Sequence, residues 1–488
     1  MTPADLSLFR YRVRDLVKRP LVTCGAAASA AEVARQLSRE RVGSVVVVDG
    51  EGRPVGIVTD RDLRRRVVAE GRDPGSIDAG SIMSAPIVAI RPAAFAFEAV
   101  LEMTRRHIRH LVVVDDTRPV GVVSSRDIMA LSTTHPVTLA REIARAVSVD
   151  ALADLARHIT VLVRQLVDEG GSAYDIGQIV AELNDRLVLR VLGLTLEERA
   201  AAGETPPSVP WCWIALGSEA RREQTLRTDQ DNGLVYGDPP EDLAEPAARF
   251  YRSFAQSAID GLVKVGFPLC PGGSMASNPR WCQPLAVWQR YFRDWLTTSS
   301  PTHVLEASIY FDLRPLAGSR ELAAGLSNII RAEAPQRRGF LETVARDVVS
   351  RPVPLTLFGN VRVPRDGAHP GALDVKGEGS LQLVGAARLL ALQLGLAETN
   401  TVDRFRAAAG AGALGALDVG EITDAFQHLT RLRLRHQLEQ LEHGKAPDNL
   451  VAPDSLSHAD ALLFRDALQT VRKVQAAIRE RFATDFLP

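Results

Sequence analysis

The most chemically informative stretch of this sequence spans residues 211–236. An apolar segment ends there in Gly217-Ser218, a short polar segment follows, and Asp229-Gln-Asp231 opens a second apolar segment. Residues i and i+2 of a strand point to the same side, so Asp229 and Asp231 are expected to share one face. Two such carboxylates repel each other unless a cation neutralises them, and Mg²⁺ suits hard oxygen ligands that lie beside phosphate.

The segment between the two apolar runs is suited to phosphate. Gly217 lets the backbone approach a ligand closely, and a helix that starts after Ser218 presents unpaired N–H groups to an anion. Metal ions that hold phosphates and the attacking oxygen stabilise the transition state of phosphoryl transfer by several kcal/mol. The spacing therefore predicts a phosphate-handling metal site.

The complete motif of residues 217–232 is G-S-x-x-R-x-E-Q-T-x-x-T-D-x-D-N. It resembles the nucleotidyltransferases that are often fused to CBS repeats. These belong to the polymerase-β-like superfamily and are related to the uridylyltransferases that modify the PII nitrogen-signalling protein. The resemblance implies that the glycine-serine pair cradles the triphosphate of a nucleotide and that the two aspartates hold Mg²⁺. It also implies that Arg221 reaches phosphate and that Glu223 orients it.

A third carboxylate from a later strand is usual in that superfamily. Residues 308–318 fit this pattern, as an apolar strand with Asp312 near its end, followed by a turn. Asp312 would complete the metal site or activate the acceptor hydroxyl as a base. The alternative is a surface ion pair between Asp312 and Arg314.

Three further residues are candidate nucleotide contacts because they match the same family. Asn278 lies in a loop expected beside the active site, between the strands of the core. Lys376, in Asp374-Val-Lys376, and Arg388 are candidates for contacting phosphates. For this last pair, surface ion pairs are an equally good interpretation.

An internal repeat occupies the first part of the chain. Residues 13–20 align with residues 79–86, and residues 56–62 align with residues 121–127. Each copy is predicted to fold as strand, helix, buried strand, turn, strand and helix. The pattern resembles tandem CBS domains, which commonly bind adenine nucleotides. The resemblance implies that four residues face this effector, namely Thr59, Asp62, Ser124 and Asp127. The alternative is that the two aspartates only cap helices.

The predicted fold is therefore a multidomain α/β and α protein. A tandem CBS (βαββα) pair is expected over 10–135, with copies at 10–70 and 76–133, and a helical linker over 137–203. A polymerase-β-like mixed α/β nucleotidyltransferase core follows over 204–320. A C-terminal helical bundle, resembling a substrate-binding domain, covers 321–488.

Composition limits the cellular setting and the partners. The net charge of −1 gives no global attraction to nucleic acid or to anionic membranes. The four cysteines form no CxxC pair, which favours a reducing compartment. No signal peptide or long apolar run is visible, so a cytoplasmic protein is expected. Because CBS pairs often associate face to face, a homodimer is expected.

The sequence thus predicts an enzyme that uses Mg²⁺ to move a nucleoside monophosphate from an NTP to an acceptor hydroxyl. The resemblance implies that the acceptor is a protein and that adenine nucleotide at the CBS pair regulates the enzyme. The alternative is a non-catalytic signalling adaptor that senses nucleotides with both modules.

Overall fold

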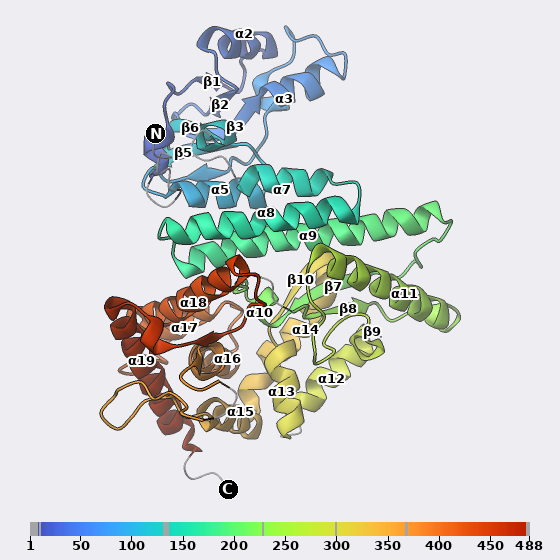
Figure 1. Cartoon of the computed structure of the whole chain (residues 1–488). Coiled ribbons are helices and arrows are strands. Elements are labelled where there is room, and N and C mark those ends of the chain that lie inside the picture. The colour runs from blue at the N-terminus through green and yellow to red at the C-terminus, as the bar shows by residue number, and fades with distance from the viewer. Residues whose placement is uncertain are drawn as a thin grey trace. The chain divides into compact units, whose positions relative to one another are not determined.

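The computed structural model describes residue 8 and residues 11–129, 136–226, 229–297, 300–366 and 369–484. The chain divides into two compact units, one of residues 1–141 with 168–171 and one of residues 142–167 with 172–488 (Figure 1). Residue 10 and residues 130–135, which belong to the predicted repeats, lie outside the described residues. No described helix is both long and apolar enough to cross a membrane.

The first unit contains two copies of one small α/β arrangement. In each copy a short strand pairs in parallel with a buried strand, which pairs antiparallel with the next strand. The two copies even share a register shift, between Val47 and Val48 and between Val113 and Val114. The predicted tandem repeat is therefore confirmed. Its elements are α1 (Val13–Leu16), β1 (Thr23–Gly25), α2 (Ala30–Glu40), β2 (Ser44–Val48), β3 (Pro54–Thr59), α3 (Asp60–Leu63), the π-helix η1 (Arg64–Val68), α4 (Ala79–Ile82), β4 (Ala89–Ile90), α5 (Ala96–Arg105), β5 (His110–Asp115), β6 (Arg118–Ser124) and α6 (Ser125–Met129).

Local sequence signals explain these elements. The valine run of β2 is buried because the strand lies inside its sheet, where β-branched side chains pack well. Helix α2 starts with a capping box in which Ser29 and Glu32 each accept the other's backbone N–H. Strand β2 and helix α2 therefore follow from local sequence signals.

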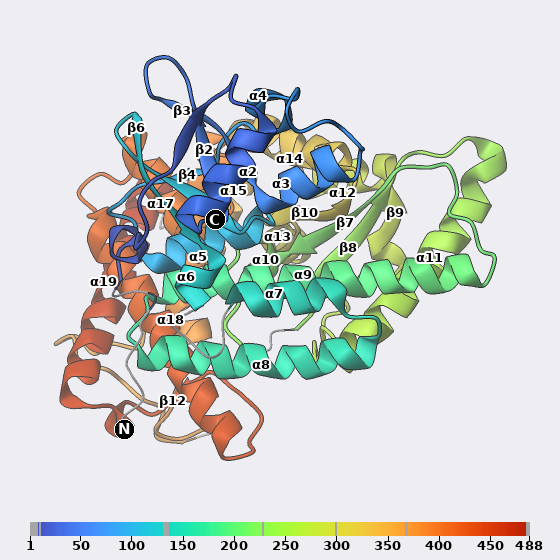
Figure 2. The same ribbon diagram turned by 90° about the horizontal axis from the view of Figure 1, so that it is seen from above.

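The second unit is built on a four-stranded sheet in the order β10-β7-β8-β9 (Figure 2). Strand β7 is antiparallel to both of its neighbours, and β8 is parallel to β9. The strands are β7 (Trp211–Leu216), β8 (Asn232–Tyr236), β9 (Cys282–Pro284) and β10 (Leu313–Gly318). The helices of this region are α10 (Gly217–Ala220), α11 (Glu241–Val265), the 3₁₀-helix η2 (Pro279–Trp281), α12 (Leu285–Thr297), α13 (Pro301–Tyr310) and α14 (Arg320–Glu333).

The segment predicted as a linker is helical, with α7 (Pro136–Arg145), α8 (Val149–Asp168) and α9 (Ala173–Ala201). Helix α9 is not a free spacer, because most of its residues are buried within the second unit and it packs against α11. Several of its buried residues are polar or charged, among them Asn184 and Asp185. This helix is therefore part of the body that carries the sheet.

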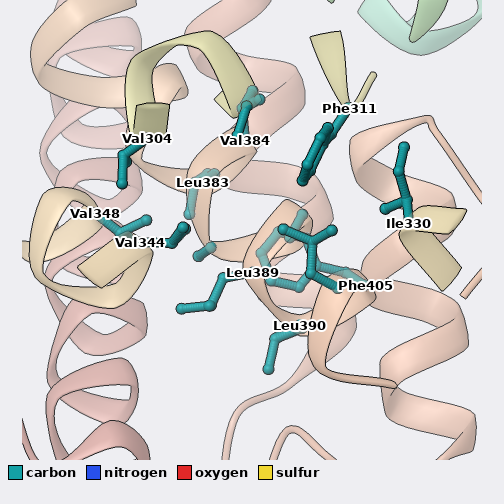
Figure 3. Close-up of a cluster of buried hydrophobic side chains, with 14 of the residues drawn as sticks. Val304, Phe311, Ile330, Val344, Val348, Leu383, Val384, Leu389, Leu390 and Phe405 are labelled. Carbon is teal, nitrogen blue, oxygen red and sulfur yellow. The ribbon is translucent and has the colours of Figure 1, made fainter. Parts of the chain in front are cut away.

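The C-terminal helices share one hydrophobic core with the sheet. Apolar side chains of β7, α13, α14, α16 and α19 belong to a single buried cluster, part of which Figure 3 shows around Phe311, Leu389 and Phe405. Residues 204–320 and 321–488, predicted as separate domains, therefore share one hydrophobic core. The remaining elements are η3 (Ala334–Gln336), α15 (Arg338–Ser350), β11 (Leu373–Asp374), the π-helix η4 (Lys376–Ser380), α16 (Leu381–Leu394), α17 (Thr401–Gly410), α18 (Val419–Glu442), β12 (Leu450–Val451), η5 (Pro453–Ser455) and α19 (His458–Phe482).

The end of β10 gives a test of this sheet. Gly318 has a φ of +84°, and a Cβ atom there would lie 2.0 Å from the Trp211 carbonyl oxygen. We expect Gly318→Ala to lower the free energy of unfolding by about 2 kcal/mol or more, measured by urea denaturation. The control is Gly325→Ala in α14, where a Cβ meets nothing within 4 Å and should stabilise the helix by about 0.5–1 kcal/mol. Equal effects of the two changes would contradict this account of β10.

Candidate active site

The backbone around Gly217 brings three segments together. Gly217 has a φ of +53°, and a Cβ atom there would lie 3.2 Å from Asp231 Oδ2. Its N–H donates to the Asp312 carbonyl oxygen (3.1 Å), and the Leu216 N–H donates to the Asp231 carbonyl oxygen (2.9 Å). Glycine is thus required by the left-handed backbone and by the nearby carboxylate. Ser218 follows in the first turn of α10, where the sequence places the phosphate-binding loop.

Asp229 and Asp231 lie beside each other at the entrance to β8. Asp229 is exposed and Asp231 is half-buried. Burial raises the pKa of Asp231, and the negative charge of Asp229 raises it further, while the Cys270 thiol, Lys376 and Arg221 oppose the shift. Two hard carboxylates that disfavour each other's charge are suited to a divalent cation. No cluster of three or more metal-binding side chains occurs among the described residues, so the other ligands of such a cation would be water and substrate phosphates.

One cation of the C-terminal region, Lys376, acts on the two aspartates, and a second, Arg433, acts on Lys376. Lys376, at the start of η4, is exposed, and the negative charges of Asp229 and Asp231 act to raise the pKa of its ammonium group. Its pKa is lowered by the surrounding protein and by Arg433 and Arg221. Burial lowers the pKa of Arg433 to about 10, and Arg221 contributes to this shift. Neither Lys376 nor Arg433 makes an ion pair within the described ranges of the chain.

Asp312 does not have the predicted role. It lies between α13 and β10 instead of at the end of a strand, and its side chain is fully buried. Its carboxylate is 2.6 Å from Arg221 Nη1, and both Arg388 and Arg404 approach it to 2.7 Å through Nη2. Burial alone would raise the pKa of Asp312, but these charges outweigh it and hold the pKa well below its usual range. Such a carboxylate is not available as a metal ligand or as a base.

Both interpretations of Arg388 are also wrong. It is neither at the surface nor turned toward phosphate, because its Nε and Nη2 both donate to Asp312 Oδ2. Arg221 is likewise buried and divides its guanidinium between Asp312 and Glu223, whose Oε2 lies 2.7 Å from Arg221 Nε. The motif's arginine and glutamate are therefore held together, and Glu223 also accepts the backbone N–H of Thr401 at the start of α17.

Arg314, the alternative surface partner of Asp312, pairs with helix α9. Its two Nη atoms each lie 2.8 Å from an oxygen of Asp185, and Nη2 also donates to the Glu219 carbonyl oxygen. Burial raises the pKa of Glu219 to about 8, and Asp185 adds to this shift. Asn184 donates to Gln224 in the same motif. Helix α9 thus holds one side of the motif loop, the segment that follows Gly217.

Asn278 supports a loop next to the aspartates. Its Oδ1 accepts the Arg280 N–H and its Nδ2 donates to the Gly273 carbonyl oxygen. The loop is joined to the strand that carries the aspartates, because the Asn232 N–H donates to the Ser274 carbonyl oxygen. The loop therefore lies beside the site as expected, with the Asn278 side chain engaged inside it.

The first unit contains a separate cleft of about 540 Å³. All four residues predicted to face an effector line it, namely Thr59, Asp62, Ser124 and Asp127. The two aspartates also take part in helix capping. Each accepts, at 2.9 Å, the backbone N–H of the threonine or serine three residues before it. The capping contacts are thus present, and a ligand-facing role of the same residues stays a prediction. The cleft is within the size range of small-ligand sites.

Family models match most of the chain. CBS domains match residues 13–69 and 79–133, and the family described as "Putative nucleotidyltransferase DUF294" matches residues 157–302. Residues 338–482 match the "Putative nucleotidyltransferase substrate binding domain". The chain belongs to this CBS-containing nucleotidyltransferase family.

Similar proteins of known sequence or structure share the CBS part of this family member. An uncharacterised protein of Methanopyrus kandleri, MK0525, is 33% identical over 131 residues, which are 27% of this chain and 67% of that protein. The CBS domain-containing protein YhcV of Bacillus subtilis is 31% identical over 116 residues, covering 24% of this chain and 81% of YhcV. A CBS domain protein of Pyrobaculum aerophilum, solved with AMP, is 37% identical with a TM-score of 0.23, covering 24% of this chain and 89% of that one.

Three residues of the second unit were not predicted from the sequence. Arg404 and Arg433 stand on helices whose register was not predicted, and Asp185 stands on the presumed linker. A signal existed for Asp185, because Glu182, Asn184 and Asp185 interrupt the apolar pattern of a long helix. Nothing local marked the two arginines.

The buried ion cluster gives a second prediction. We expect Asp312→Asn to lower the free energy of unfolding by about 3–5 kcal/mol at neutral pH, because the three arginines lose their partner. The folded pKa of Asp312 is depressed, so its stabilisation is present above the ordinary carboxyl range and is lost as the pH falls. The difference between variant and wild type in urea denaturation should therefore narrow in acid.

The control for this change is Asp154→Asn, which removes an exposed partner of Arg157 and should cost under about 1 kcal/mol. An Asp312→Asn protein of unchanged stability that lost only turnover would restore the predicted catalytic role.

Proposed function

We propose that this protein is a Mg²⁺-dependent nucleotidyltransferase that moves a nucleoside monophosphate from an NTP to an acceptor hydroxyl. The observation that carries this proposal is that Asp229, Asp231 and the ammonium group of Lys376 act on one another electrostatically, with Arg433 beside Lys376. The two aspartates suit a divalent ion, and the two cations suit a polyphosphate. A metal–NTP complex combines both charges.

The reaction needs few chemical groups from the protein. The acceptor oxygen forms a bond to the α-phosphorus, the bond from that phosphorus to the bridging oxygen breaks, and pyrophosphate leaves with the electron pair. The hydroxyl proton passes to a base or to solvent. Catalysis of this kind depends on positioning and on electrostatic stabilisation.

This chain's residues would divide that work. Asp229 and Asp231 would hold Mg²⁺, which when bound neutralises charge on the phosphates. Gly217 and Ser218 would place the motif loop against the triphosphate, while Lys376 and Arg433 would contact its oxygens. Arg221 is fixed by Asp312 and Glu223, so it would contribute mainly through its charge.

The setting of the reaction rests on the resemblance. A protein acceptor follows from the similarity to PII-modifying enzymes, and regulation by an adenine nucleotide follows from the CBS pair and its cleft. We further propose a cytoplasmic homodimer.

One observation favours a second candidate, a non-catalytic nucleotide-sensing adaptor. The third carboxylate expected of the superfamily, Asp312, is bound by three arginines. In an adaptor, Asp229 and Asp231 would bind the ligand without turnover.

The two candidates are separated by incubation with each α-labelled NTP and Mg²⁺, with and without cell lysate. We expect pyrophosphate release or label transfer that falls by about 10³-fold or more in Asp229→Ala/Asp231→Ala, since metal binding contributes several kcal/mol. Tight binding of an NTP with no turnover in the wild type would instead establish the adaptor.

The cation pair is tested by Lys376→Gln and Arg433→Gln. Each should weaken NTP binding by about 10- to 100-fold in calorimetry, because a charge-assisted hydrogen bond is lost. The control is Arg435→Gln on the same helix, where the arginine pairs with Asp460 and should not affect NTP. Equal affinities of all three variants would remove these cations from the site.

A further inference from the structure

A hairpin of residues 353–363 follows helix α15 and is separate from the residues of the proposed reaction. Leu355 and Val361 pair across this 353–363 hairpin in an antiparallel bridge. Two hydrogen bonds close its turn, one from the Thr356 N–H to the Asn360 carbonyl oxygen (2.8 Å) and one from the Asn360 N–H to Thr356 Oγ1 (3.1 Å). These contacts give the segment a defined shape.

The 353–363 hairpin is attached to the second unit at its arms and at its turn. The arm residues that pack against the hydrophobic core of that unit are Val353, Leu355, Val361 and Val363. In the turn, Gly359 is buried with a φ of +78°, and a Cβ atom there would lie 3.2 Å from Gln469 Nε2 of α19. The hairpin is therefore held in place before any partner binds, which lowers the entropic cost of binding.

The tip of the hairpin consists of Leu357 and Phe358, and it faces solvent. The two residues are 99% and 94% exposed, the largest fractions among the large apolar residues that the structure describes. Single exposed apolar side chains are common, but these two are adjacent and stand on an anchored turn. Removal of both from water would favour binding. The tip is therefore suited to insertion into an apolar pocket of a partner.

The surroundings of the tip are positively charged. Arg351, Arg362 and Arg365 are exposed, and Arg472 of α19 is exposed close to the turn, with its Nη2 4.0 Å from a Cβ atom on Gly359. None of these four arginines forms an ion pair with another described residue. The sequence also contains no acidic residue from 348 to 365. A partner that covers the tip therefore needs acidic groups around its pocket.

An acidic protein surface matches the hairpin better than a second copy of this chain does. A symmetric contact between two copies would bring the same arginines together, and like charges would oppose it. Aromatic residues and arginine are enriched at the dominant positions of protein interfaces, whereas Lys, Asp and Glu are depleted there. The segment 351–365 has this composition, because it contains Phe358 and three arginines but no Lys, Asp or Glu.

The hairpin is also within reach of the candidate active site for a partner of protein size. Lys376 follows Val363 so soon in sequence that the intervening chain spans at most about 45 Å. This length is on the scale of a protein domain. One acceptor protein can therefore contact the hairpin and present a hydroxyl near Asp229 and Asp231.

We infer that the 353–363 hairpin docks the protein acceptor by inserting Leu357 and Phe358 into an apolar pocket bordered by carboxylates. The arginines around the tip pair with those carboxylates. This inference rests on the proposed transferase function and names the surface that selects its acceptor.

The test is label transfer from α-labelled NTP to lysate proteins, with Mg²⁺ and the full chain, comparing wild type with Leu357→Ser/Phe358→Ser. We expect labelling to fall by about 10- to 100-fold, since residues that fill a partner's pocket dominate binding. NTP affinity in calorimetry and the unfolding midpoint should stay as in the wild type, because the tip is exposed and is not part of the nucleotide site. The matched control is Val147→Ser, which removes another exposed apolar side chain (83%) and should label like the wild type.

Charge reversal tests the acidic border separately. Arg362→Glu/Arg365→Glu should reduce labelling by about 10-fold or more, whereas Arg362→Lys/Arg365→Lys should retain most of it, because the charge is kept. Unchanged labelling in the tip variant would overturn the docking role and leave the transferase standing. The same holds if the tip variant labels normally but loses dimers in light scattering or loses binding to phosphatidylserine vesicles, which would assign the tip to a second copy or to lipid. Wild-type turnover without any labelled protein would overturn both the docking role and the protein acceptor.

Discussion

The second unit depends on the burial of one carboxylate among three guanidinium groups. Asp312 is inaccessible to solvent, and it holds Arg221 of the motif loop, Arg388 of α16 and Arg404 of α17. Each of these ions would be costly to bury alone, so removing one of them leaves the others buried without a full set of partners. The cluster therefore fastens the phosphate-binding motif to the C-terminal helices. It joins the sheet and those helices in addition to the hydrophobic core that they share.

This fastening decides where the candidate site can form. With the C-terminal helices fixed against the sheet, Lys376 acts electrostatically on Asp229 and Asp231, although it lies far away in sequence. Arg433 in turn acts on Lys376. Helix α9 holds the opposite side of the motif through Asp185 and Arg314. The motif loop is thus held from both sides by residues outside it, which is the support that a preorganised phosphate site requires.

Sequence reasoning succeeded where the signal is local. The tandem repeat and the strand into Gly217 follow from short patterns, and the structure places them as expected. Asp229 and Asp231, predicted to open the second strand, instead lie just before β8. Sequence reasoning failed where a polar residue's partner is distant. The apolar run before Asp312 suits a helix as well as a strand, and nothing near it marks Arg388 or Arg404 as partners. The same limit hid Arg433, which stands on a helix with several arginines.

The distinction between a structural and a functional carboxylate therefore lies in how many of its oxygens the protein uses. Asp312 and Asp62 have both oxygens engaged, by arginines or by Ser84, and they stabilise the fold. Asp229 and Asp127 remain accessible, and the cations Lys376 and Arg433 are likewise left without ion-pair partners in the described chain. Charged groups that are accessible or lack an ion-pair partner contribute little to folding, and like charges held close together oppose folding. Ligands that complete these groups would give them a role, which a motif alone cannot distinguish from a cap.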